Sequence, residues 1–244
     1  MWAPWDDPRV DWRRFALVVV RSAWDYAERR HEFLRFAESV PRIENPVPVL
    51  RLGADKERYL TMLGRRGVPV VPTSFVTRDS PFEPWPGPFV VKPAVSAGGR
   101  RSARFEAGDE AARALVAEIT AAGETAIVQP LLESAPETSL VYLDGRFSHS
   151  LSRRAALPLG RASEVLFLEE ELAPHEATDA ERRVADAALA LLPAPTLYAR
   201  VDLLGGRVLE LEVVEPSLYL SHGDGAADRL AVAVAGRALG TLRA

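Results

Sequence analysis

The sequence of 244 residues predicts a mixed fold of the α+β class, in which helices alternate with strands but several strands pair antiparallel. Two short turns, Asp144-Gly145 and Gly205-Gly206, each join two apolar runs directly, and such turns are typical of β-hairpins. Elsewhere, strand patterns are followed by helix patterns, as they are in α/β proteins. We therefore expect α+β subdomains with antiparallel sheets rather than one doubly wound sheet.

The first half of the chain starts with one strand and one helix, which are too little for an independent domain. A run of β-branched residues without alternation predicts a buried strand at 16–20, and a helix pattern covers 26–38. A connector with several prolines follows at 41–48. The later elements expected here are a helix at 54–66, strands at 68–76, 89–93 and 126–129, a proline-rich surface loop at 79–88 and a helix at 109–121.

The second half is organised around the two hairpins. We expect the strands of the first at 140–143 and 147–151, and those of the second at 198–204 and 207–214. The helices expected in this half are an alanine-rich amphipathic helix at 178–192 and a last helix at 226–239.

Composition argues against several classes of protein. The formal net charge is −4 and there is no dense basic run, which argues against non-specific nucleic-acid binding. The apolar run near the start, 15–20, is too short to cross a membrane. The absence of cysteine excludes disulfides and thiol nucleophiles, and we expect a cytoplasmic protein.

Lysine is rare in this chain. Of the 30 basic residues only Lys56 and Lys92 are lysines. Lysine is a compact charge on a flexible stem whereas arginine is a planar fork, so a site that threads a cation between phosphate oxygens favours lysine. Lys92 also ends an apolar strand, where an ammonium group is costly unless an anion binds it. The alternative is that both lysines remain by chance on a solvated surface.

Carboxylates gather on the second hairpin. Asp202 lies on one strand, and Glu210 and Glu212 project together from the other because residues two apart face the same side of a strand. Three carboxylates on one face repel each other unless a cation binds, and Mg²⁺ prefers such oxygen ligands together with nucleotide phosphates. The alternative is an acidic strand edge that faces water.

A short glycine-containing stretch, 96–101, follows Lys92 after three residues. Glycine permits backbone N–H groups to approach a phosphate closely. The spacing matches neither the P-loop nor the dinucleotide-binding fingerprint. The position of the stretch after Lys92 is what favours a phosphate-binding role.

Taken in order, six motifs resemble those of the ATP-grasp superfamily. They are Asp55-Lys56, 89–93 (Phe-Val-Val-Lys-Pro), 96–99 (Ser-Ala-Gly-Gly), 127–132 (Ile-Val-Gln-Pro-Leu-Leu), 199–202 (Ala-Arg-Val-Asp) and 209–212 (Leu-Glu-Leu-Glu) with Pro216. The similarity covers residue 51 to the C-terminus. It is closest to the branch of glutathione synthetases and RimK-type ligases, and within that branch to cyclo-ligases of D-cycloserine biosynthesis. It implies two α+β subdomains that clasp ATP, preceded by a reduced small α/β N-terminal domain.

The resemblance implies a role for each motif. Lys56 and Lys92 match lysines that contact the nucleotide phosphates, and Asp202, Glu210 and Glu212 match the metal ligands. The positions that match the mobile loop over the triphosphate are Ser96, Gly98 and Gly99. Those that match the linker beside adenine are Gln129, Pro130, Leu131 and Leu132.

Three further charged positions carry over. Glu137 falls near the ribose-binding acid of the family, with Glu133 as the second choice. Arg153, or its neighbour Arg154, matches a basic residue that approaches the phosphates. Arg200 precedes the metal aspartate and matches an arginine that stabilises charge on the phosphoryl group or on the tetrahedral intermediate.

Two features depart from the family pattern. Relatives commonly have asparagine where Glu212 stands, although a carboxylate also binds Mg²⁺. Relatives begin with a complete small α/β domain, whereas the strand and helix expected before Trp5 are missing, so either the start is truncated or that domain is reduced. We divide the chain into 1–50 (N-terminal remnant), 51–128 (first ATP-grasp subdomain) and 129–244 (second subdomain, with the metal hairpin).

Arg21 and Asp25 follow the carboxyl end of the first strand, where α/β sheets hold ligands. On one hypothesis Arg21 pairs with the carboxylate of a substrate. On the other, the two residues only form a salt bridge at a helix start, with Asp25 as its cap.

These inferences predict an ATP- and Mg²⁺-dependent carboxylate–amine ligase, with Mn²⁺ as a second usable metal. A carboxylate of an amino-acid-like small molecule would form an acyl phosphate, and an amine would displace the phosphate without any side-chain nucleophile. The alternatives are an intramolecular cyclo-ligase of a specialised metabolite and a non-catalytic nucleotide-binding module with a truncated acceptor domain. We expect small-molecule carboxylate and amine substrates and no nucleic-acid or membrane partner, and we allow for a homodimer.

Overall fold

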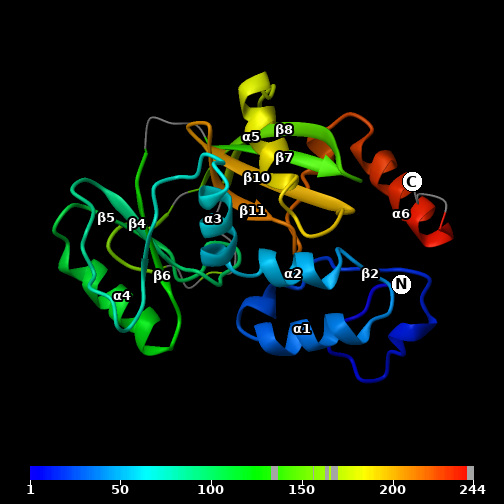
Figure 1. Cartoon of the computed structure of the whole chain (residues 1–244), viewed down its shortest axis with the longest axis horizontal. Helices are drawn as coiled ribbons and strands as arrows, with labels where there is room; N and C mark the ends of the chain where they lie inside the picture. The colour runs from blue at the N-terminus through cyan, green and yellow to red at the C-terminus, as the bar shows by residue number, and fades with distance from the viewer. Residues whose placement is uncertain (133–136, 156, 163–164, 166–169, 241–244) are drawn as a thin grey trace.

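The computed structural model describes residues 1–132, 137–155, 157–162, 165 and 170–240, and three β-sheets and six α-helices lie within them (Figure 1). A four-stranded sheet with one helix forms the left lobe in Figure 1, a five-stranded sheet forms the centre, and a small N-terminal layer lies below it. Helices and antiparallel sheets are both present, as the α+β prediction requires.

The N-terminal layer is built on two short parallel strands. β1 (Val18–Val19) pairs with β2 (Ile43–Glu44), and α1 (Arg30–Ser39) lies between them in sequence. The first part of the helix expected at 26–38 is instead a separate 3₁₀ turn, Trp24–Ala27. An aromatic cluster that includes Trp5, Trp12 and Phe36 fills the core beside α1, whereas Trp2 is 83% exposed.

The expected connector at 41–48 contains a short strand and the start of a helix. These are β2 and the first residues of α2 (Val47–Gly53). Pro48 lies in the first turn of α2, where the missing N–H has no intrahelical partner to lose. Next comes α3 (Lys56–Arg65), whose N-cap Asp55 accepts a hydrogen bond from the backbone N–H of Arg58.

The four-stranded sheet has the order β3-β6-β4-β5, and its pairs are antiparallel. Its strands are β3 (Ser74–Val76), β4 (Phe89–Pro93), β5 (Ala103–Phe105) and β6 (Ala126–Pro130). The helix α4 (Glu110–Ala121) packs on it through buried apolar side chains such as Leu115 and Ile119. The strand expected at 68–76 is shorter than predicted, and β5 was not predicted because its three residues carry little pattern.

The five-stranded sheet has the order β11-β10-β7-β8-β9 and is antiparallel throughout. Its strands are β7 (Glu137–Leu143), β8 (Arg146–Ala155), β9 (Glu170–Pro174), β10 (Tyr198–Leu204) and β11 (Arg207–Glu212). Both predicted hairpins are confirmed, and Gly205 and Gly206 have the positive φ that this turn requires. α5 (Asp179–Leu189) packs on β10 and β11, while α6 (Ala226–Leu239) packs near β7.

The two larger sheets meet around α3. Tyr59, Leu60 and Leu63 of α3 pack in the same core as Leu211 of β11 and as residues of α5, so this helix covers the five-stranded sheet. The predicted division at 128/129 falls inside β6, and the division into domains stays a prediction. Within the described residues, no helix is long and apolar enough to cross a membrane.

Candidate functional site

Four charged side chains of the second hairpin lie opposite one another across two strands. In the register of β10 and β11, Asp202 is paired with Glu210 and Arg200 with Glu212. Residues two apart on a strand share a face, so all four belong to one side of the sheet. Asp202 also faces Ser139 on β7. The hairpin alone therefore brings together the three predicted metal ligands and the predicted catalytic arginine.

Asp202 is completely buried and is held by three side chains. Its Oδ1 accepts a hydrogen bond from Ser139 Oγ at 2.6 Å and one from Arg200 Nε at 2.8 Å. Its Oδ2 accepts hydrogen bonds from Arg200 and Arg153, each at 2.9 Å. Burial by itself would raise the pKa of Asp202, but the charges of Arg153 and Arg200 outweigh it and lower that pKa below its usual value.

Arg153 connects more of this site than the sequence indicated. Besides Asp202, it pairs with its cross-strand partner Glu137 and donates to Glu170 Oε1 at 2.7 Å. The predicted role of Arg153 near the phosphates is compatible with this position. The predicted ribose acid Glu137 is engaged by this arginine, and the second choice, Glu133, lies outside the described residues.

Glu170 lies on the exposed strand β9 and takes part in this network. Its carboxylate binds Arg153 and also accepts a hydrogen bond from Tyr219 Oη at 2.7 Å. The guanidinium of Arg200 lies 5.5 Å from the centre of the Tyr219 ring. Nothing in the local sequence marks Glu170, because its partners come from β8 and from the segment before α6.

Lys92 reaches from the four-stranded sheet to the metal hairpin. Its Nζ donates to Glu210 Oε1 at 2.6 Å, and the two side chains are only 10% and 16% exposed. Burial would raise the pKa of Glu210, but Lys92 and then Lys56 lower it far below the usual range. The prediction that Lys92 needs an anionic partner is therefore confirmed, and in this structure that partner is a carboxylate.

Lys56 is also buried, which excludes the alternative of a solvated surface lysine. It occupies the first position of α3, and its Nζ donates to the carbonyl oxygen of Ser96 at 2.9 Å. Gly98 and Gly99 have φ angles of 63° and 77°, which glycine adopts without strain. Lys56 thus contacts the start of the glycine-containing stretch, and this contact brings the predicted phosphate-binding loop beside the predicted phosphate-binding lysine.

The buried Glu212 ionises less readily than an ordinary glutamate. Removal from water raises its pKa to about 7, and neighbouring Glu210 adds to this effect while Arg200 opposes it. Glu212 and Glu210 share a hydrogen bond, which favours the anion of Glu210. Among the described residues Glu212 forms no ion pair, so its carboxylate lacks a bonded cation.

The three carboxylates fit a divalent cation by chemistry, but they are not arranged around a common point. The described part of the chain contains no cluster of three acidic or histidine side chains in a metal-binding geometry. Glu210 is turned to Lys92 and Asp202 to two arginines. The three carboxylates supply oxygen donors of the kind that Mg²⁺ prefers, and their role as metal ligands stays a prediction.

The predicted adenine linker lies at the end of β6. Gln129 is buried, and its Nε2 donates to Thr73 Oγ1 at 3.0 Å in the neighbouring segment. Pro130 ends the strand, and the N–H of Leu131 donates to the carbonyl oxygen of Pro88 at 2.8 Å. Gln129 and the N–H of Leu131 are therefore already bonded within the protein, and Leu132 follows half-buried. An adenine role for these residues stays a prediction.

Arg21 and Asp25 have separate surroundings. Asp25 accepts a hydrogen bond from Trp5 Nε1 at 2.9 Å and pairs with Arg29, while the 3₁₀ turn that contains Asp25 has no side-chain cap. Arg21 is half-buried, and its guanidinium lies 5.2 Å from the centre of the Tyr198 ring. Its Nη1 is buried and has no hydrogen-bond partner within the described ranges. The cap hypothesis for Asp25 is therefore wrong.

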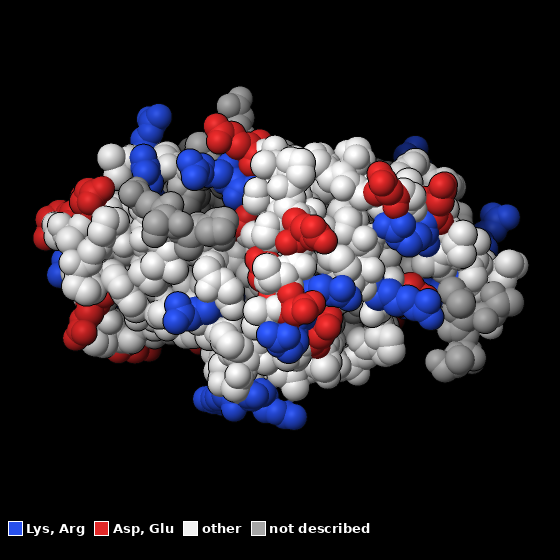
Figure 2. Space-filling model, turned by 90° about the horizontal axis from the view of Figure 1, so that it is seen from above, with Lys and Arg blue, Asp and Glu red and all other residues white. Residues whose placement is uncertain are grey.

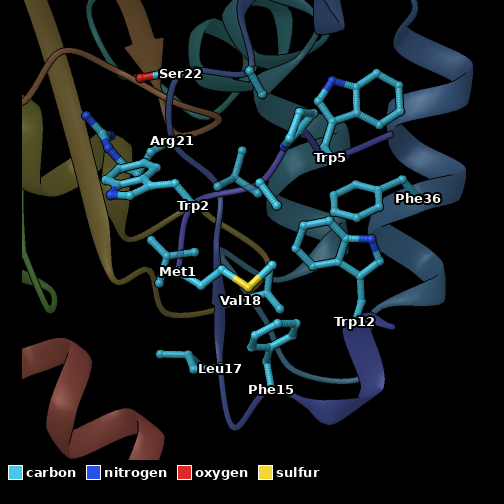
Figure 3. A pocket seen from close by; sticks show the side chains of 15 residues that line it. Met1, Trp2, Trp5, Trp12, Phe15, Leu17, Val18, Arg21, Ser22 and Phe36 are labelled. Carbon is cyan, nitrogen blue, oxygen red and sulfur yellow. The ribbon is translucent and has the colours of Figure 1, made fainter. Parts of the chain in front are cut away.

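Figure 3 shows the cavity beside Arg21, with a volume of about 160 Å³. Trp5, Trp12 and Phe36 lie on one side of it, and Arg21 and Ser22 lie on the other. The aromatic side is the core of the N-terminal layer. Arg21 thus marks the boundary between this apolar core and the polar site around the metal hairpin.

We expect Glu212 to make the metal-free protein less stable as the pH rises. Its pKa is about 7 in the folded state against an ordinary value of 4.5, so the folded state keeps a proton that the unfolded chain has lost. This stabilising contribution is complete below about pH 4.5 and is lost as the pH rises to about 7. Glu212→Gln cannot ionise, so its melting temperature, measured with a chelator present, should fall less steeply over this range.

The exposed substitution Glu106→Gln is the matched control for that experiment, because it removes a glutamate that lies on the surface. It should leave the pH dependence of wild type unchanged. Parallel curves for Glu212→Gln and wild type would show that Glu212 does not hold the proton.

The comparison with protein families matches the start of the chain. Residues 1–47 match the family described as "D-cycloserine synthetase DcsG, N-terminal domain". Over nearly its whole length the chain is 38% identical to the cycloserine biosynthesis protein DcsG of Streptomyces lavendulae, and the match covers 96% of this chain and 87% of that protein.

Solved structures are similar over the same extent. The crystal structure of D-cycloserine synthetase DcsG matches with a TM-score of 0.80 and 36% identity, covering 96% of this chain and 88% of that one. D-alanine–D-alanine ligase from Bacillus anthracis complexed with ATP matches with a TM-score of 0.62 and 16% identity, covering 90% of this chain and 75% of that one. The ATP-grasp ligase PsnB complexed with minimal precursor matches with a TM-score of 0.60 and 19% identity, covering 90% of this chain and 78% of that one. The last two likenesses concern the fold alone.

Proposed function

Because this chain belongs to the D-cycloserine synthetase family of ATP-grasp ligases, we propose that it activates the carboxylate of an amino-acid-like small molecule with ATP and joins it to an amine. Membership of this family confirms the expected ATP-grasp fold and the expected class of ATP-dependent carboxylate–amine ligase. The residue roles, the intermediate and the substrate described below belong to the proposal.

The observation that carries the proposal is the meeting of Lys92 with the three-carboxylate face of the hairpin. Lys92 comes from one sheet and Glu210 from the other, and both are largely buried. Without nucleotide they neutralise each other. When ATP binds, Lys92 and Lys56 would transfer to phosphate oxygens, and Glu210 would become available as a metal ligand.

Bound Mg²⁺ would supply charge neutralisation for the phosphates. The residues that would hold it are Asp202, Glu210 and Glu212, for which carboxylate chemistry and the unpaired Glu212 are the support. Mn²⁺ is expected to replace Mg²⁺ because both prefer oxygen ligands. Release of Arg200 from Asp202 would leave its guanidinium free to stabilise charge that develops on the substrate.

The remaining residues would position the reactants and exclude water. The loop with Ser96, Gly98 and Gly99 would cover the triphosphate, and its contact with Lys56 supports this position. Arg153 would approach the phosphates from β8. Catalysis of this kind depends on positioning and charge stabilisation rather than on a protein nucleophile.

The chemistry takes two steps. A carboxylate oxygen attacks the γ-phosphorus of ATP, the bond from that phosphorus to the β-phosphate oxygen breaks, and ADP leaves. The amine nitrogen then attacks the acyl carbon of the acyl phosphate. The carbon–nitrogen bond forms, the carbon–oxygen bond to phosphate breaks, and the nitrogen loses a proton as inorganic phosphate departs.

Similarity to DcsG favours ring closure within one molecule as the more specific form of this reaction. D-Cycloserine is a ring closed by a bond between its carboxyl-derived carbon and a nitrogen carried on the side-chain oxygen. A ligase that forms such a ring needs one substrate that carries both groups. Retention of the charged residues at the site argues against a non-catalytic nucleotide-binding module.

We expect ADP release to require only one organic substrate. Serine derivatives that carry a nitrogen on the side-chain oxygen should support ATP consumption alone, whereas pairs of simple amino acids should not. ADP is measured by a coupled assay and the cyclic product by mass spectrometry. ADP release that needs two separate molecules would show an intermolecular ligase, and ATP binding without ADP from any substrate would favour the non-catalytic alternative.

Small molecules are the partners of this ligase class. On the face shown in Figure 2 basic and acidic side chains lie interspersed, which supports the expectation that no nucleic acid binds. The lack of cysteine and the use of ATP fit the cytoplasm, where we expect the protein to act. A homodimer stays a possibility that molecular mass in solution would test.

A further inference from the structure

Glu215 is a buried carboxyl group that the residue roles described above do not use. It lies three residues after Glu212, beyond the end of β11, and it is 7% exposed. Its Oε2 is buried and has no hydrogen-bond partner among the residues that the structure describes. A buried carboxyl oxygen without a partner is costly, so it is expected to have one in a functional complex.

Arg21 presents the complementary feature on the adjacent segment. Its Nη1 is a buried donor for which the described part of the chain offers no acceptor. Arg21 and Glu215 are not ion-paired with each other, although each affects the pKa of the other. One unsatisfied donor and one unsatisfied acceptor therefore lie near each other without meeting.

Tyr198 fixes the two segments side by side. Its hydroxyl group lies 2.6 Å from the carbonyl oxygen of Val20 and 2.9 Å from that of Val214, so one O–H is shared between the residues that precede Arg21 and Glu215. The Tyr198 ring also packs below the Arg21 guanidinium. The two unsatisfied groups are thus held by a fully buried tyrosine rather than by a loop tip.

The surroundings of Glu215 are short of positive charge. Burial raises its pKa to about 8, the nearby Glu212 adds to this, and Arg21 and Arg200 only partly oppose it. A cation at Oε2 would relieve this shortage. Because Arg200 and Glu212 are among the charges that act on Glu215, the position borders the proposed reaction centre.

We propose that Glu215 and Arg21 together bind the head group of a zwitterionic α-amino acid, with the substrate ammonium on Glu215 Oε2 and one substrate carboxylate oxygen on Arg21 Nη1. An inorganic anion would satisfy Arg21 alone, and a metal ion would satisfy Glu215 alone. The second carboxylate oxygen stays available for attack on ATP, and the ammonium takes no part in the reaction. This inference rests on the proposed function, since it names the substrate class of the same site.

The test uses D-cycloserine as the probe, because it keeps a free ammonium group and the oxygen on its carboxyl-derived carbon resembles a carboxylate oxygen. Isothermal titration calorimetry measures its binding, with N-acetyl-D-cycloserine as the form without ammonium and D-serine as a second zwitterion. In wild type, acetylation should weaken binding about 10- to 100-fold through loss of a charged hydrogen bond. Glu215→Gln should weaken the binding of D-cycloserine by a similar factor, and it should remove most of the difference in affinity between D-cycloserine and its acetylated form.

Glu106→Gln is the matched control and should bind D-cycloserine as wild type does, because Glu106 is exposed. Affinity for a non-hydrolysable ATP analogue, measured in each variant, should stay unchanged. If Glu215→Gln fails to fold, the wild-type comparison of D-cycloserine with its acetylated form still decides the matter.

The outcomes separate this inference from the proposed function. Equal binding of D-cycloserine by wild type and Glu215→Gln, or equal binding of D-cycloserine and its acetylated form by wild type, overturns the inference and leaves the ligase proposal intact. A wild type that binds the ATP analogue but neither D-cycloserine nor D-serine overturns the inference and the ring-closure proposal together.

Discussion

Asp202→Asn is expected to lower the free energy of unfolding by about 3 to 5 kcal/mol and to lower kcat by about 100-fold or more. Asp202 is fully buried and accepts hydrogen bonds from Ser139, Arg200 and Arg153. An amide has the same size but no charge, and one of its two positions donates instead of accepting. Urea denaturation and ADP release measure the two effects.

The loss of stability should come mainly from Arg200. Arg153 keeps Glu137 and Glu170 as ion-pair partners. Among the described residues, Arg200 keeps no ion pair and retains the carbonyl oxygen of Ser217 and the face of Tyr219. A buried guanidinium without a counter-ion is strongly destabilising. The double variant Asp202→Asn with Arg200→Gln should therefore lose less stability than the two single effects added together.

Asp79→Asn is the control, because Asp79 is exposed and the same change there should stay within about 0.5 kcal/mol of wild type. A stable Asp202→Asn protein with normal kcat would refute both the structural role of Asp202 and its role as a metal ligand. A loss of kcat with unchanged stability would support only the role of Asp202 as a metal ligand.

Lys92→Arg is expected to weaken ATP binding about 10- to 100-fold although it keeps the positive charge. Lys92 is 8% exposed at the end of β4, and its Nζ lies 2.6 Å from Glu210 Oε1. The planar fork of arginine is larger than an ammonium group and cannot occupy the same space without moving the two sheets apart. Calorimetry with a non-hydrolysable ATP analogue measures the effect.

The opposite exchange at the exposed Arg65, Arg65→Lys, is the matched control and should leave ATP affinity unchanged. Lys92→Met extends the test, since it keeps the length of the side chain and removes the charge. If Lys92→Arg binds the analogue as wild type does, Lys92 is only a counter-ion of Glu210 and does not contact the nucleotide.

The prediction of the second hairpin succeeded because its determinants are local. A two-residue glycine turn fixes the pairing of β10 with β11, and alternation along a strand brings Asp202, Glu210 and Glu212 to one face. Local pattern failed where short elements depend on their neighbours. β5 and β9 have few residues and form only because β4 and β8 offer them edges. The prolines at 46 and 48 suggested a connector, whereas Pro48 lies in the first turn of α2, where proline is tolerated.

The sequence alone indicated what kind of partner these residues need. A lysine in an apolar strand and carboxylates on one face of a strand both require partners of opposite charge. Which partners they meet was decided by tertiary packing. Lys92 and Glu210 are 118 residues apart in the chain and come together only where the two larger sheets meet. Arg21 and Glu215 are adjacent because Tyr198 holds their segments together. Contacts of this range depend on how whole sheets pack, and the period of a single strand or helix carries no information about them.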